Sequence, residues 1–201
     1  MKDTKEIVLF FKEETNFSLV DASHEILSRY KELGEPIVFP DDGKTRAPLI
    51  LFTKNPEFQI QVSRVSVGIV VNHNYFKKLE SLIFDMVDAF EEIGCSFYRI
   101  GYISSIFLSP DYVKKAKNKF FKIEELEGVS DFNLSWYRKL KNKYSDVNCW
   151  ERFITDSRSF NDLLIQYDFN TNVNETIKFE MKYIKEFVRT ANEFIESRLD
   201  F

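Results

Sequence analysis

Hydrophobic residues recur along this chain of 201 residues with two spacings, one typical of strands and one typical of helices, and the order in which these patterns follow one another restricts the fold. Apolar residues that alternate with polar ones, or that run together briefly, predict strands at 7–11, 49–53, 58–62, 65–71, 98–108, 132–140, 147–154 and 163–169. Apolar stripes at helical spacing predict helices at 19–33, 74–93, 109–122 and from 174 onward. Because strands and helices do not alternate strictly, a doubly wound parallel sheet is disfavoured. We predict an α+β fold, with amphipathic helices packed on one face of an antiparallel or mixed sheet and a long C-terminal helix.

Several residues are typical of helix ends. Ser18 is a predicted N-cap of the first helix, and Gly34 follows its last apolar residue. Gly94 stands where the second helix should stop. The run Ser109-Pro110-Asp111 predicts the start of the third helix, since proline fits the first turn and an acid faces the positive helix end.

The length fits a single domain covering residues 1–201. The segment 124–131 resembles an internal linker, so two halves, 1–123 and 132–201, are an alternative division. We find no repeat in the sequence, although both halves end in a long predicted helix. The turn-rich segment 36–48 is predicted to form a loop.

Composition points to a globular protein with an excess of aromatic rings. The chain is 44% hydrophobic and 30% charged, carries a net charge of −4, and contains 21 Phe. So many rings exceed what one core readily hides, and exposed rings would mark a partner surface; the alternative is that Phe simply replaces Leu in the core. Cys95 and Cys149 are predicted to be reduced and partly buried. No apolar run is long enough for a signal peptide or a membrane span, which predicts a cytoplasmic protein without membrane partners.

No catalytic, metal-binding or cofactor-binding motif is visible. The two histidines, His24 and His73, have no Cys or His at metal-ligand spacing. A nucleophile elbow, a phosphate-binding loop and a dinucleotide fingerprint are all absent from the sequence. We therefore expect no metal and no cofactor, and favour a non-enzymatic role without excluding an enzyme.

Two groups of residues are candidate binding sites. In the segment 112–143, basic residues are interleaved with aromatic ones, a combination that holds single-stranded nucleic acid; the candidates are Lys115, Lys117, Lys119, Arg138 and Lys141. The alternative for this segment is a solvated basic surface. Polar and aromatic residues inside predicted strands could instead converge on one sheet face and bind a partner; the candidates are Arg99, Trp136, Tyr137, Trp150 and Arg152. Glu151, Gln166 and Asp168 would join that surface if the strands align; the alternative is that these polar residues form a solvent-facing sheet surface without a partner.

The strand 99–106, which reads Arg-Ile-Gly-Tyr-Ile-Ser-Ser-Ile, resembles a motif of one protein family. This bacterial family is sporadically distributed, functionally uncharacterised and of about this length. Arg99 and Gly101 match its motif, and serine replaces its asparagine. The run 163–168 and the terminal helix resemble later parts of the family, so the resemblance covers nearly the whole chain. In order of elements only, the chain also resembles SecB-like chaperones, in which strands and a terminal helix expose an apolar groove. Neither resemblance implies catalytic residues.

Three functional interpretations follow from these features. The first is a non-enzymatic bacterial protein that binds another protein through an aromatic-rich sheet face or groove, in a chaperone-like or regulatory role. The alternative is a nucleic-acid-associated protein that uses the segment 112–143, and the third is an enzyme with a dispersed site. The broad apolar stripe of the terminal helix also predicts a homodimer, through that helix or through an adjacent strand edge.

Overall fold

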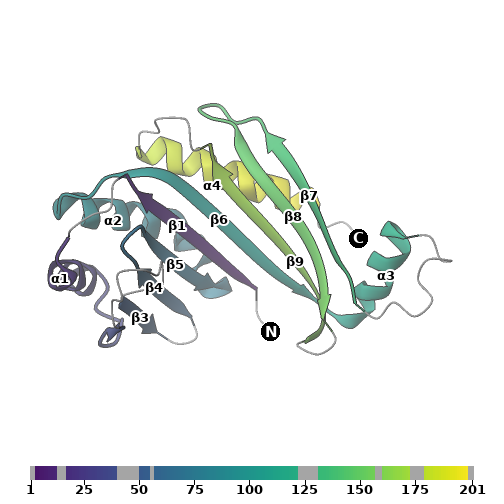
Figure 1. Ribbon diagram of the computed structural model, residues 1–201, viewed down its shortest axis with the longest axis horizontal. Coiled ribbons are helices and arrows are strands. Elements are labelled where there is room, and N and C mark those ends of the chain that lie inside the picture. Colours follow the sequence, from purple (N-terminus) through teal and green to yellow (C-terminus); the bar gives the residue numbers. More distant parts are fainter. Residues whose placement is uncertain are drawn as a thin grey trace.

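A single antiparallel sheet of nine strands organises the chain (Figure 1). The computed structural model describes residues 3–12, 17–39, 50–54, 57–121, 131–156, 160–172 and 179–198. The strands are β1 (Thr4–Phe11), β2 (Ile37–Val38), β3 (Ile50–Lys54), β4 (Phe58–Val62), β5 (Ser66–Asn72), β6 (Phe97–Leu108), β7 (Asn133–Leu140), β8 (Val147–Asp156) and β9 (Phe160–Thr171). Their order across the sheet is β2-β3-β4-β5-β1-β6-β9-β8-β7, and every described pairing is antiparallel.

The described helices pack on one face of this sheet. They are α1 (Leu19–Arg29), α2 (Leu79–Glu92), α3 (Pro110–Phe120) and α4 (Met181–Glu196), and a 3-10 helix, η1 (His73–Lys78), precedes α2. In Figure 1, α2 and α4 lie behind the strands. The α+β class and the antiparallel sheet predicted from the sequence are therefore confirmed, and an α-helix lies within each of the four predicted regions. The second begins later than predicted, at Leu79, because residues 73–78 form the 3-10 helix η1.

Alternation along each strand creates the face that the helices cover. In β1, Ile7, Leu9 and Phe11 are buried, whereas Val8 and Phe10 between them are only half-buried. Rings from the helices complete this apolar layer: Phe90 of α2 lies 5.3 Å from Phe11 between ring centroids. Most of the aromatic excess is therefore core, because these rings fill the space between helices and sheet.

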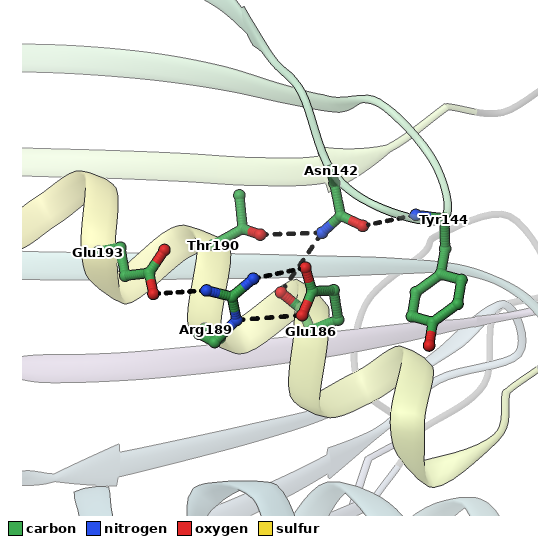
Figure 2. A network of polar contacts seen from close by, with 6 residues as sticks. All are labelled: Asn142, Tyr144, Glu186, Arg189, Thr190 and Glu193. Carbon is green, nitrogen blue, oxygen red and sulfur yellow. Dashed lines mark hydrogen bonds and ion pairs between the residues drawn. The ribbon is translucent and has the colours of Figure 1, made fainter.

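Polar contacts fasten α4 to the turn between β7 and β8 (Figure 2). Asn142 in that turn donates from Nδ2 to the Glu186 carbonyl at 3.3 Å and to Thr190 Oγ1 at 2.9 Å. Its Oδ1 accepts a hydrogen bond from the Tyr144 amide at 3.0 Å. The Tyr144 ring stacks on Tyr183, with 4.7 Å between centroids. The turn therefore contacts the polar side of α4, while the apolar side of the helix packs on the sheet.

The apolar stripe of α4 is buried within its own chain. Its buried residues are Ile184, Phe187, Val188, Ala191 and Ile195. The sequence analysis expected part of this stripe to remain uncovered and to support a dimer. Because the sheet covers these residues, the structure gives no basis for dimerisation through this stripe, and self-association stays a prediction.

The order of elements repeats within the chain, although no sequence repeat was found. The first half runs β1, α1, β3, β4, β5 and α2, and the second runs β6, α3, β7, β8, β9 and α4. The sheet order reads β3-β4-β5-β1 and then β6-β9-β8-β7, so the halves are related by an approximate two-fold axis between β1 and β6. The short edge strand β2 has no counterpart among the described elements. This repeat divides the chain between α2 and β6, whereas the sequence suggested a division at residues 124–131.

Local sequence predictions mostly match the described elements. The Asp21 amide donates to Ser18 Oγ at 3.4 Å, as expected of an N-cap. Both cysteines are free and buried. The strand β2 was missed inside the predicted loop 36–48, of which residues 40–48 lie outside the described residues. The linker predicted at 124–131 also lies outside them, except for Asp131.

Gly94 provides a test of this architecture, because its φ of +83° is a left-handed conformation after α2. We expect Gly94→Ala to lower the free energy of unfolding by about 1 kcal/mol, since a Cβ is unfavourable in that region. Urea denaturation measures the change. The matched control is Gly34→Ala, where φ is not positive and a Cβ would meet its nearest neighbour at an ordinary 3.6 Å. An equal loss in both variants would contradict this explanation.

Candidate functional site

The second face of the sheet, hereafter the open face, is covered by none of the described helices. It is formed by the strand residues that alternate with the core positions. One row crosses seven strands at matching register; from β7 to β4 it contains Tyr137, Trp150, Asp168, Ile103, Glu6, Val70 and Gln59. The open face therefore places side chains from both halves of the chain in one line.

Two exposed aromatic residues begin this row. Tyr137 on β7 is 53% exposed and Trp150 on β8 is 39% exposed. Their ring centroids lie 5.3 Å apart, and the Tyr137 hydroxyl donates to Asn148 Oδ1 at 2.7 Å. This bond and the ring contact hold both side chains in place. The pair thus presents a preorganised apolar surface, the kind that anchors protein interfaces.

A polar network lies beside the aromatic pair. Arg152 on β8 donates from Nη1 to Gln166 Oε1 at 2.9 Å, and its Nη2 lies 3.8 Å from Asp168 Oδ2. Gln166 Nε2 in turn contacts Ser105 Oγ on β6 at 3.5 Å. Arg152, Gln166 and Asp168 therefore lie together on one sheet face. Glu151, which the sequence analysis placed with them, points to the opposite, helix-covered face, because it alternates with Trp150 and Arg152 along β8.

Glu6 on β1 is a member of the open face that the sequence analysis missed. Burial raises the pKa of its carboxyl group above the ordinary value of 4.5, and the charge of Asp168 raises it further. The place of Glu6 before the apolar run 7–11 was the available signal, because alternation from Ile7 assigns Glu6 to the face opposite the core. Two carboxylates thus repel each other across β6.

A hollow of about 130 Å³ adjoins Glu6. It forms where Gly68 of β5 provides no side chain opposite Val8 of β1, and Gln61 and Ser66 also line it. A Cβ built on Gly68 would approach Glu6 Oε1 to 3.9 Å. The hollow can accept the aliphatic part of a long side chain while its end group reaches the Glu6 carboxylate.

The structure does not bring all predicted partner residues together. Arg99 lies on the open face, where its guanidinium covers the Phe10 ring at 4.9 Å. On β6, Ser105 is level with Arg152, and Arg99 lies six residues before Ser105. Arg99 is therefore about 20 Å from the Arg152 network along the strand direction. Trp136 points to the opposite, helix-covered face, because it precedes Tyr137 in a strand whose side chains alternate. The inclusion of Trp136 in the open surface was wrong.

The predicted nucleic-acid residues also separate. Lys119 and Arg138 line one pocket together with Trp136. Lys141 forms an ion pair with Asp146 at 3.1 Å in the turn between β7 and β8. Lys115 lies over the Tyr112 ring at 4.5 Å on α3, and Lys117, on the same helix, is half-buried. Of the five, the described contacts therefore unite only Lys119 and Arg138.

Neither a metal group nor a membrane span is found in the described part of the chain. No three His, Cys, Asp or Glu side chains there are placed to hold a metal ion. None of the described helices combines the length and apolar content needed to cross a bilayer.

Comparison with models of known protein families and with curated proteins found no match.

The raised pKa of Glu6 predicts a pH-dependent effect on stability. A carboxyl group that binds its proton more tightly in the folded protein destabilises the fold once it ionises. We therefore expect Glu6→Gln to increase the free energy of unfolding at pH 7, and the gain to shrink as the pH falls from the raised pKa of Glu6 towards 4.5, below which it disappears. Urea denaturation between pH 4 and 8 measures the difference from the wild type.

The matched control is Glu91→Gln, which alters an exposed carboxylate on α2. A gain for Glu6→Gln that is the same at every pH would show that the repulsion with Asp168 and the burial of Glu6 are not its cause.

Proposed function

We propose that this is a non-enzymatic cytoplasmic protein that binds another protein through its open face. The supporting observation is the row in which an exposed aromatic pair, two carboxylates and half-buried apolar residues lie side by side. A chaperone-like or regulatory role would use such a face, as the resemblance in the order of elements suggests.

The size of the open face favours a macromolecular partner. Nine strands at about 4.8 Å spacing span roughly 38 Å, and the row from Tyr137 to Gln59 crosses seven of them. A stable protein interface buries about 800 Å² on each partner. A face of this width can provide such an area, whereas its hollow of about 130 Å³ suits one side chain.

The two carboxylates in the row favour a lysine or arginine on the partner at that point of the open face. The carboxylates of Glu6 and Asp168 repel each other, and a cation placed between them would relieve that repulsion. The rings of Tyr137 and Trp150 also attract cations to their faces. A basic side chain lying along the row would therefore meet both features.

At the point of the row where Glu6 and Asp168 lie, the carboxylates disfavour phosphate groups, whereas Arg152 and Arg99 on the same face would not repel them. The alternative function would use Lys119 and Arg138 on the other side of the sheet. The experiment below distinguishes this nucleic-acid function from protein binding.

The test uses a variant that lacks the aromatic pair, Tyr137→Ala with Trp150→Ala, and a tagged wild type for comparison. Proteins captured from a lysate of the native host are quantified by mass spectrometry, with and without nuclease. The protein that depends most on the pair is then purified, and its binding is measured by calorimetry. We expect the double variant to weaken binding by at least about 30-fold, as for paired interface anchors. Asp168→Asn should weaken it by about fivefold, because that change removes one attractive charge.

The matched control is Phe39→Ala, since Phe39 is 41% exposed beyond β2 at the opposite edge of the sheet. It should bind the purified partner as the wild type does. Equal binding by the double variant, or capture that disappears with nuclease and with Lys119→Glu, would contradict the proposal. The second result would support the nucleic-acid function.

A further inference from the structure

A second candidate site lies on the helix-covered side of the sheet, between α3 and the end of α4. It is a pocket of about 250 Å³. Lys119 and Phe120 come from α3, Trp136 and Arg138 from β7, Glu151 and Phe153 from β8, and Arg198 follows α4. None of these residues belongs to the open face, so the pocket is independent of the function proposed above.

The pocket exists because the two halves of the chain place their helices differently. In the first half, α1 packs against α2 and the two helices close over the sheet. In the second half, α3 packs on β9 and has no comparable contact with α4. The space left over β7 and β8 is the pocket.

Three aromatic rings form one side of the pocket. Phe120 lies 5.1 Å from Trp136 and 4.8 Å from Phe153 between ring centroids, and Trp136 lies 5.5 Å from Phe153. Each ring therefore contacts the other two, and the three come from different elements. Such a cluster offers flat apolar surface to a planar group.

Charged groups line the other side. Glu151 is buried, with 3% of its surface exposed, and its Oε2 lies 3.3 Å from Arg138 Nε. Its Oε1 lies 4.0 Å from Arg198 Nε. With Lys119, three cationic side chains line the pocket against one carboxylate, which leaves an excess of two positive charges. Arg138 and Arg198 remain about 40% exposed, so their guanidinium groups can reach a further anion.

We infer that this pocket binds a small organic anion that carries one aromatic ring, as an aryl phosphate or an aryl carboxylate does. The ring lies against Phe120, Trp136 and Phe153, and the acidic group lies between Arg138 and Arg198. Planar guanidinium groups match both phosphate and carboxylate oxygens. Glu151 holds the two arginines in place before the anion arrives. A pocket of about 250 Å³ has room for one ring and one acidic group.

The two tryptophans allow a direct measurement, because Trp136 lines the pocket and Trp150 lies on the open face. In a Trp150→Phe protein, fluorescence reports on Trp136 alone. The probes are phenyl phosphate and benzoate, which separate the two kinds of acid. Inorganic phosphate lacks the ring, and benzyl alcohol lacks the charge. We expect at least one aryl anion to change the fluorescence with a Kd below about 1 mM, and both partial probes to bind at least about tenfold more weakly.

Variants then test the arginines. Arg198→Gln should weaken the bound aryl anion at least about tenfold, as expected when a hydrogen bond to a charged group is lost. Arg138→Gln combined with Glu151→Gln should do the same without leaving a buried carboxylate unpaired. Lys141→Gln is the matched control, since Lys141 pairs with Asp146 in the neighbouring turn, and it should bind as the wild type does. Thermal melting confirms that each variant is folded.

No binding of either aryl anion up to about 10 mM would overturn the inference. So would equal affinity in the arginine variants and the wild type, or equal affinity for an aryl anion and for inorganic phosphate.

Discussion

The pairing of β1 with β6 is the contact on which the rest of the structure depends. It joins the sheet of the first half to the sheet of the second, from Thr4 opposite Ser105 to Phe11 opposite Phe97. Without it each half would end in an exposed strand edge with unpaired backbone groups. Ile7 and Tyr102 are paired at this seam and are both fully buried, so the seam also joins the two parts of the core.

This seam also makes the open face continuous. Glu6 belongs to the first half and Asp168 to the second, and their carboxylates interact only because β1 and β6 are neighbours. The approximate two-fold relation between the halves places the remaining strands of each half on either side of the β1–β6 pair. A broad surface then results from a five-stranded and a four-stranded unit, each of which alone would be narrower.

The outer strands β7 and β8 serve both faces of the molecule. Tyr137 and Trp150 point to the open face, whereas their neighbours Trp136 and Glu151 line the pocket on the helix side. A one-residue difference in position thus separates a proposed protein surface from a proposed site for a small anion. The pocket further depends on α3 lying apart from α4, an asymmetry within an otherwise repeated order of elements.

The sequence by itself determined most of the local structure: the strands other than β2, the helix ends at Ser18 and Gly94, and the α+β class. These features depend on the spacing of hydrophobic residues and on the backbone preferences of residues close together in the chain, and both can be obtained from the sequence alone. Only the tertiary structure decided which strands are neighbours, and with them the repeat, the row through Glu6 and the separation of Trp136 from Tyr137. The strand register sets which face each residue occupies, and it depends on contacts between residues as distant as Glu6 and Ile103. Alternation could assign Glu6 to a face, but no local pattern places it one strand away from a carboxylate 162 positions later in the chain, at Asp168.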